Sequence, residues 1–226
     1  MSAGSERALP REVLADLDAA GVVAGRPLVA LDCDEVIVAF AGHLARWLEG
    51  VGYEIRLTQY QLEGAIYPSG ETRPVPFEGA IRLLDAFFEE ETARQEPLDG
   101  ALEAIARLEE IAQVVVLTNV PRPARAARID NLARLGLRAP VIANAGGKGA
   151  ALAWLAAAAD GAPAAFVDDS PSQIASAARR APEVRRIHFR GSPFIRSVLP
   201  EAPEAEASPE DWAACEAAVR RALEGG

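Results

Sequence analysis

Two aspartates that are separated by one residue follow a short apolar run near the start of the chain. The run covers residues 27–31, Asp32 follows it directly, and Asp34 comes two positions later. Residues i and i+2 of an extended segment face the same side. Two carboxylates in this arrangement can share a cation, or one can act as a nucleophile while the other acts as an acid and base. Because such a pair often occurs by chance, its meaning depends on the rest of the chain.

Polar residues also follow two later apolar runs. Thr118 and Asn119 follow one of them, and Asp168 and Asp169 follow the other. Carboxylates are hard oxygen ligands that suit Mg²⁺, and the sequence has no Cys/His cluster that would suit zinc. The hydroxyl of Thr118 and the amide of Asn119 can hold phosphate oxygens. These residue types therefore suit a magnesium ion and could hold phosphate oxygens.

The only lysine of the chain is the last candidate. The 23 basic residues comprise 22 arginines and Lys148. Lysine carries a compact point charge, whereas arginine carries a planar fork, so the two are not interchangeable. Lys148 lies in the glycine-rich segment 144–149, just before a predicted helix, and a helix N-terminus favours anions. We therefore expect Lys148 to neutralise phosphate charge.

Predicted strands and helices alternate along most of the chain. Short apolar runs predict strands at 27–31, 114–117, 140–142, 164–167 and 184–189. Amphipathic patterns predict helices at 10–20, 98–111, 124–135, 150–159 and 172–180. Continuously apolar runs are typical of parallel strands that are covered on both faces, so the pattern predicts an α/β fold with a parallel sheet. Open sheets of this class bind ligands at the carboxyl ends of their strands, where the candidate aspartates, Thr118 and Asn119 lie, and Lys148 is expected nearby.

One segment interrupts this alternation. Residues 40–96 carry helical patterns at Gly42 to Gly50 and at Phe77 to Glu91. They predict a mostly helical insert between the first and second strands of the sheet. The remaining residues, 1–39 and 97–226, are predicted to form the α/β core.

Composition narrows the functional classes. A net charge of -10 argues against nucleic acid or an anionic membrane surface as the main partner. No stretch of 18 apolar residues is present, and the first 21 residues lack the apolar region of a signal peptide. Two cysteines, Cys33 and Cys215, do not suggest a disulfide framework, so we expect a cytoplasmic protein. An anionic substrate then needs local cations or a metal ion.

The order of the candidate residues resembles the four motifs of the haloacid dehalogenase (HAD) superfamily. In chain order the matching positions are Asp32-x-Asp34, Thr118-Asn119, Lys148 and Asp168-Asp169. The resemblance implies a Rossmann-like core and a phosphatase-type hydrolase. It also implies that residues 40–96 form a helical cap of the C1 type, which closes over the site and selects a small phosphorylated metabolite.

The resemblance also implies a role for each aspartate. Asp32 would attack phosphorus to give an aspartyl-phosphate. Asp34 would protonate the leaving oxygen and then activate the water that hydrolyses this intermediate. The Mg²⁺ ion would be held by the Asp32 carboxylate, the Asp34 backbone carbonyl and the pair Asp168-Asp169. Either member of that pair could bind the metal directly.

The resemblance assigns the phosphoryl group to three other residues. Thr118, the backbone at Asn119 and Lys148 would hold it during transfer. Phosphoryl transfer depends mainly on positioning and charge neutralisation, which such groups provide. Within the insert, four side chains could contact substrate or instead form cap core and solvated surface: Trp47, Tyr60, Tyr67 and Arg73. His43, His188 and Cys33 are expected to serve packing.

The first motif departs from the usual pattern. Glu35 stands where glycine usually follows the second aspartate, which would place another carboxylate near the metal. Glu35 and the sequence Asp169-Ser170-Pro171 resemble protein phosphatases of the carboxy-terminal-domain type, although those enzymes lack a C1 cap. A phosphomutase and a non-catalytic binding protein on the same scaffold are further alternatives. Dehalogenases of the superfamily lack the acid/base aspartate and need no metal, so Asp34 counts against that activity.

Overall fold

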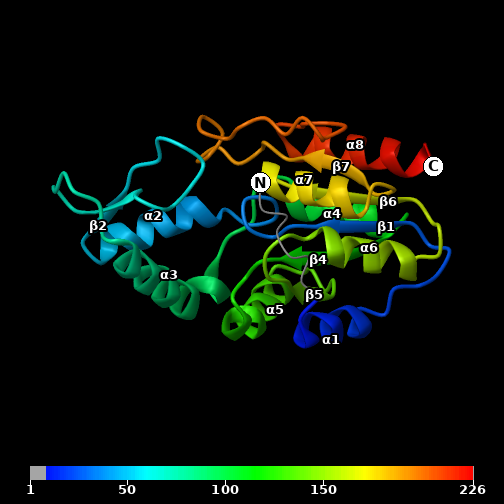
Figure 1. Cartoon of the computed structure of the whole chain (residues 1–226), viewed down its shortest axis with the longest axis horizontal. Coiled ribbons are helices and arrows are strands. Elements are labelled where there is room, and N and C mark those ends of the chain that lie inside the picture. Colours follow the sequence, from blue (N-terminus) through cyan, green and yellow to red (C-terminus); the bar gives the residue numbers. More distant parts are fainter. Residues whose placement is uncertain (1–8, 226) are drawn as a thin grey trace, which may run out of the picture.

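A five-stranded parallel sheet forms the centre of the computed structural model, which describes residues 9–225 (Figure 1). The strand order is β5-β4-β1-β6-β7. The strands are β1 (Leu28–Leu31), β4 (Gln113–Thr118), β5 (Val141–Ala143), β6 (Ala164–Asp168) and β7 (Arg185–His188). The predicted parallel α/β sheet is therefore confirmed. The outermost residues of the predicted core, 1–8 and 226, lie outside the described residues. Residues 1–8 are also the start of the 21-residue segment in which no signal peptide is expected.

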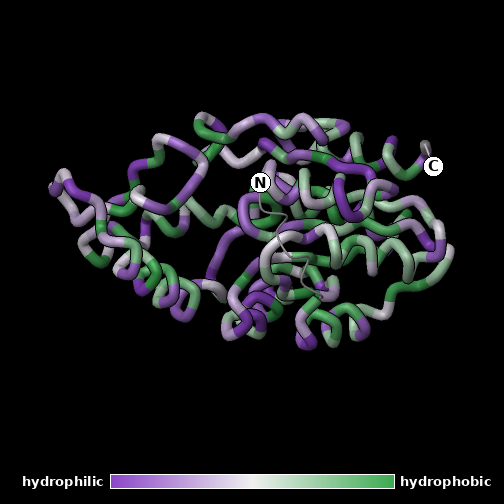
Figure 2. The backbone as a smooth tube through the Cα atoms, in the orientation of Figure 1, coloured by the Kyte–Doolittle hydropathy of each residue, from purple (hydrophilic) through white to green (hydrophobic). Residues whose placement is uncertain are grey.

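Helices cover both faces of the sheet. They are α1 (Arg11–Ala19), α4 (Ala101–Glu109), α5 (Arg125–Arg134), α6 (Gly149–Ala158), α7 (Pro171–Arg180) and α8 (Trp212–Glu224), with a short 3₁₀ turn at Arg122–Ala124. Side chains of β1 alternate between two hydrophobic clusters. Val29 and Leu31 pack with α4, α5 and α8, whereas Leu28 and Ala30 pack with α1, α6 and α7. The central strands are accordingly hydrophobic along their length (Figure 2). None of the described helices has the length and apolar character required to cross a membrane.

The insert lies at one end of the molecule, beyond the sheet (Figure 1). It contains α2 (Phe40–Gly50), β2 (Tyr53–Ile55), β3 (Ile66–Pro68), α3 (Phe77–Glu91) and a 3₁₀ turn at Thr92–Arg94. Its two helices agree with the sequence pattern, whereas the antiparallel β2–β3 pair was not predicted. The rings of Phe40 and Phe87 meet edge to face at 5.4 Å in its core. Ile195 and Leu199, from the segment after β7, join the same hydrophobic cluster.

The backbone at the start of α6 lies tightly against α7. The Lys148 N–H donates to Gln173 Oε1 at 2.8 Å, and the Gly149 N–H donates to Ser176 Oγ at 3.1 Å. A Cβ atom on Gly149 would lie 2.2 Å from the Ser176 carbonyl oxygen, a distance that atoms do not adopt. Glycine is therefore required at position 149, and the contact fixes the backbone that carries Lys148.

We expect Gly149→Ala to lower the free energy of unfolding by about 1–3 kcal/mol, because the backbone carbonyl of α7 cannot rotate away from the new methyl group. Urea denaturation measures this loss. Gly50→Ala is the matched control, since a Cβ atom at that end of α2 meets nothing within 4 Å and alanine favours helix. Equal stability of the two variants would contradict close packing between α6 and α7.

Candidate active site

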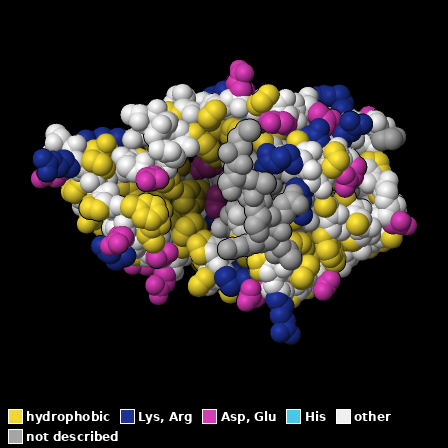
Figure 3. All heavy atoms as spheres, viewed as in Figure 1, with side chains coloured by type: hydrophobic (Ala, Val, Ile, Leu, Met, Phe, Trp, Pro, Cys, Tyr) yellow, Lys and Arg dark blue, Asp and Glu magenta, His cyan; other side chains and the backbone are white. Residues whose placement is uncertain are grey.

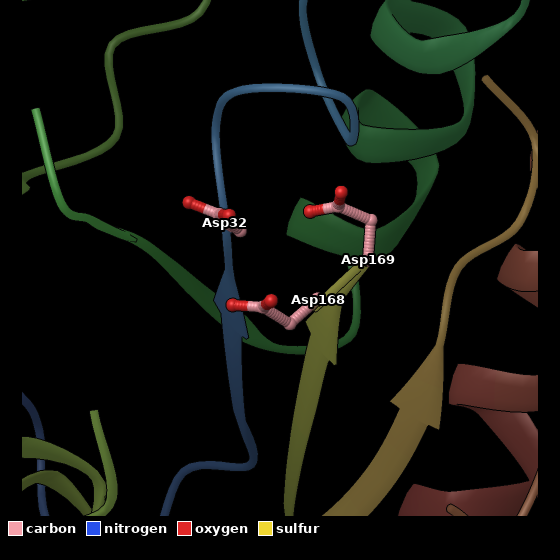
Figure 4. A group of neighbouring side chains, drawn as sticks. All are labelled: Asp32, Asp168 and Asp169. Atoms are coloured by element: carbon pink, nitrogen blue, oxygen red, sulfur yellow. The ribbon is translucent and has the colours of Figure 1, made fainter. Parts of the chain in front are cut away.

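Three carboxylates converge at the carboxyl edge of the sheet. Ligand atoms of Asp32, Asp168 and Asp169 all lie within 4.8 Å of one another, and the three side chains face a common space (Figure 4). Asp32 follows β1 and Asp168 ends β6. These strands are parallel neighbours with Leu31 paired to Val167, so the next residue of each strand reaches the same edge. The structure thus brings together three of the predicted site residues.

Lys148 joins two of these carboxylates. Its Nζ lies 2.7 Å from Asp32 Oδ1 and 2.6 Å from Asp168 Oδ2. The side chain is 1% exposed. Burial disfavours the ammonium charge, but Asp168 and Asp32 together hold the pKa of Lys148 above its ordinary value. Lys148 therefore stays positively charged, while its expected contact with phosphate stays a prediction.

The cluster has a charge imbalance that a divalent cation would offset. Three carboxylates and one ammonium group leave two negative charges when all are ionised. Burial, followed by the Asp168 charge, raises the pKa of Asp169 well above its ordinary value, and burial also raises the pKa of Asp168. Three buried hard oxygen donors at this spacing fit Mg²⁺. The donor chemistry therefore agrees with the predicted metal ligands, while the Asp34 carbonyl contact stays a prediction.

The side chain of Asp34 forms a separate ion pair with a residue that sequence reasoning missed. Arg128 Nη2 donates to Asp34 Oδ1 at 2.6 Å, and Nη1 donates to Asn131 Oδ1 at 3.2 Å. The Arg128 side chain is 0% exposed, whereas that of Asp34 is 24% exposed. Burial raises the pKa of Asp34, and the Arg128 guanidinium opposes this shift. A sequence signal existed, because Ala124, Arg128 and Leu132 share the buried face of the predicted helix.

The hydrogen bonds of Thr118 and Asn119 join neighbouring loops. The Thr118 side chain is buried, and its hydroxyl accepts the Val120 N–H at 3.2 Å. Asn119 Nδ2 donates to the Gly146 carbonyl, and its Oδ1 accepts from Asn144 Nδ2, both at 2.9 Å. Asn119 thereby joins the end of β4 to the loop that precedes α6. Their predicted contacts with a phosphoryl group stay predictions.

Glu35 links the loop after β1 to two other parts of the chain. Its φ of 62° lies in the left-handed region that favours glycine, which matches the position where the resembled motif has Gly. One carboxylate oxygen accepts the Ala41 N–H in the first turn of α2, and the other accepts the Ser192 hydroxyl. Burial raises the pKa of Glu35 to about 7. Glu35 lines the same cavity as Asp32 and Asp169 but is not one of the three carboxylates that converge, and its carboxylate attaches the loop after β1 to the insert.

A cavity of about 300 Å³ separates the sheet edge from the insert. Tyr60 is the one predicted insert candidate that reaches it, and its hydroxyl donates to Asp169 Oδ2 at 2.6 Å. Trp47 instead donates to Glu90 at 3.0 Å, Tyr67 packs beneath Arg56, and Arg73 is exposed. Tyr60 therefore connects the insert to the acidic cluster.

The two histidines and Cys33 lie in packed surroundings. His43 Nε2 is 2.8 Å from Glu91 Oε2, and its ring packs against Phe87. His188 is fully buried, with Nε2 2.9 Å from the Asp169 carbonyl oxygen. Cys33 is fully buried in the sheet core. These placements agree with the packing roles expected from the sequence, and His188 also supports the backbone of the acidic cluster.

We expect Arg128→Met to lower the free energy of unfolding at pH 8 by about 3 kcal/mol, because the partly buried Asp34 carboxylate loses its partner. Adding Asp34→Asn should restore part of this loss, which urea denaturation of the single and double variants measures. Arg134→Met, on the exposed face of the same helix, is the control, with an expected loss of about 0.5 kcal/mol. Strictly additive losses in the double variant would contradict the ion pair.

The raised pKa of Glu35 predicts a pH dependence of stability. The folded state binds the proton more tightly than the unfolded state, in which the pKa is near its ordinary 4.5. Stability from this group is therefore full below pH 4.5 and falls as the pH rises to about 7, by about 3 kcal/mol in total. Glu35→Gln is neutral throughout. The difference in free energy of unfolding between Glu35→Gln and wild type should therefore grow by that amount between pH 4.5 and pH 8. A difference that is constant with pH would contradict the shift.

Comparisons with known proteins identify the fold through structure alone. No protein-family model and no curated protein matches the sequence. A haloacid dehalogenase-like protein of unknown function from Agrobacterium tumefaciens shares 21% identity at a TM-score of 0.59, over 87% of this chain and 99% of that chain. A HAD family hydrolase from Deinococcus radiodurans, solved with bound phosphate and sodium, shares 18% identity at 0.59, over 88% and 97%. An L-2-haloacid dehalogenase shares 11% identity at 0.58, over 86% and 100%.

These structures differ in what their names say of activity but agree in architecture. Each is matched over more than four-fifths of both chains. The motif resemblance found in the sequence is thereby confirmed at the level of the fold. The chain has the haloacid dehalogenase-like fold, with a buried acidic cluster at the carboxyl edge of its parallel sheet.

Proposed function

We propose that this protein is a Mg²⁺-dependent phosphomonoester hydrolase that acts on a small substrate through an aspartyl-phosphate at Asp32. The observation that carries the proposal is the buried cluster of Asp32, Asp168 and Asp169 with Lys148 beside it. A nucleophilic carboxylate and a phosphate dianion repel each other. Positive charge must therefore offset this repulsion when the two groups approach each other. Lys148 supplies one positive charge, and the three carboxylates would bind a cation that supplies more.

The chain's own residues supply the two chemical steps. An oxygen of Asp32 forms a bond to phosphorus while the ester oxygen leaves and takes a proton from Asp34. Asp34, now ionised, then takes a proton from water as that water attacks phosphorus. Inorganic phosphate is released and the Asp32 carboxylate is restored. Burial raises the pKa of Asp34, which favours the protonated form that the first step needs.

Lys148 and the acidic cluster control charge during both steps. The ammonium group of Lys148 contacts Asp32 directly and so offsets negative charge as the phosphate approaches. When bound, Mg²⁺ would supply the remaining positive charge on the transferring oxygens. The carboxylates of Asp32, Asp168 and Asp169 would hold it, together with the backbone carbonyl of Asp34. The Deinococcus radiodurans hydrolase binds phosphate and a cation on a similar fold, which supports this assignment.

Two observations favour this function over its alternatives. The Tyr60–Asp169 hydrogen bond brings the insert onto the site. The cavity of about 300 Å³ between the insert and the sheet edge then suits a small substrate better than the peptide segment that a protein phosphatase binds. A dehalogenase would use the Asp32 nucleophile on carbon, as the similarity to an L-2-haloacid dehalogenase allows. Such a reaction has no use for the pair Asp168-Asp169. Release of inorganic phosphate from a phosphomonoester would distinguish the proposed hydrolase from a phosphomutase and from a binding protein.

We expect wild type to hydrolyse an aryl phosphate with Mg²⁺ and to lose this turnover in EDTA. Asp32→Asn should reduce kcat at least about 1,000-fold because it removes the nucleophile. Asp130→Asn, on the exposed face of α5, is the matched control and should retain full activity. Phosphate release measures all three.

Three results would contradict the proposal. Activity that persists in Asp32→Asn would exclude the aspartyl-phosphate. Activity that is unaffected by EDTA would exclude the metal. Halide release from a 2-haloacid, without phosphate release from any ester, would assign the protein to the dehalogenases.

A further inference from the structure

The cavity has two chemically different halves. The half at the sheet edge is polar and contains Asp32, Asp34, Glu35, Asn119, Lys148, Asp169, Ser170 and Gln173. The other half is formed by the insert and the segment after β7, and contains Phe40, Ala41, Leu57, Tyr60, Gln61, Leu62, Ile195 and Val198. If phosphate occupies the polar half, then the part of the substrate that enters the rest of the cavity contacts the apolar half.

The cavity offers no cation for a second anionic group. Lys148 is the one basic residue among the described residues that line it. Its ammonium group is already engaged by Asp32 and Asp168 at 2.7 and 2.6 Å. Asp34, Glu35 and further carboxylates on the same wall would repel additional negative charge. A substrate with a carboxylate or a second phosphate on its body would therefore bury an unpaired anion.

The apolar half also offers little to a polyhydroxylated substrate. The Tyr60 hydroxyl donates to Asp169, which leaves Gln61 as the side chain with amide groups for a ligand on this side. Six other residues of this half are Ala, Val, Leu, Ile or Phe. Burying several hydroxyl groups against them without partners would cost binding free energy. Hydrophobic side chains border the hollow on the insert side, with acidic side chains deeper inside (Figure 3).

We infer that the substrate is the phosphomonoester of a hydrophobic alcohol, with an aryl or branched alkyl body that carries no second anionic group. This inference rests on the proposed phosphatase function. A cavity of about 300 Å³ suits a body of about the size of one substituted ring. The insert then selects substrates by excluding charge from an apolar wall.

The test compares phenyl phosphate with 4-carboxyphenyl phosphate and with glycerol phosphate. We expect kcat/KM for phenyl phosphate to exceed that for either of the others by at least about tenfold. Leu57→Lys places a cation on the apolar wall and should reduce the ratio between phenyl and 4-carboxyphenyl phosphate by about tenfold. Val51→Lys, at an exposed position of the insert outside the cavity, is the matched control and should leave the ratio unchanged.

Binding separates failure of this inference from failure of the catalytic proposal. Calorimetry with Mg²⁺ compares phenylphosphonate with 4-carboxyphenylphosphonate, neither of which can be hydrolysed. Preferred binding of phenylphosphonate without turnover of any ester would support the apolar site and overturn the phosphatase. Equal or reversed preference, or no binding of either compound, would overturn the inference.

Discussion

The ion-pair network of one buried ammonium group holds the site together. Lys148 contacts carboxylates from two neighbouring strands, so it joins the ends of β1 and β6 through charge as well as through the sheet hydrogen bonds. Its backbone is fixed by the contact of α6 with α7. The helical layer, the sheet and the acidic cluster therefore depend on one another. Without that single charge, burial would raise the pKa of Asp168 further, because the Lys148 charge opposes that shift.

Asp34 and Glu35 are adjacent residues of one loop, but their side chains contact different parts of the chain. The Asp34 side chain turns toward Arg128 on α5, while the Glu35 side chain reaches the insert and the segment after β7. The residues that would do chemistry are thus supported from three directions: the sheet, a core helix and the insert. Tyr60, which also belongs to the insert, contacts Asp169 across the cavity. The site is an assembly of distant segments around a few fixed carboxylates.

Much of the core could be predicted from the sequence, because buried parallel strands are short apolar runs and their polar ends share one edge of the sheet. Asp32, Asp168 and Asp169 could be grouped for this reason, and Lys148 was placed near them because it precedes a predicted helix. The β2–β3 pair could not, because three-residue strands leave almost no periodic signal. Arg128 was missed because a charged residue on a helix is ordinarily solvated, and its burial becomes intelligible only with Asp34 as its partner. The partners of Glu35 lie 6 and 157 positions away in the sequence, so a local sequence pattern could not identify them.

The left-handed backbone at Glu35 has a consequence for how the insert can move. Glycine at this position would relieve a backbone cost of about 1–2 kcal/mol, but it would remove both hydrogen bonds of the carboxylate. The chain thus tolerates local strain and gains a fixed contact between the loop after β1 and the first turn of α2. Any motion that admits substrate while this contact holds must pivot beyond Ala41. The outer part of the insert would then be the part that moves, and the first turn of α2 would keep its position relative to the loop that follows Asp32.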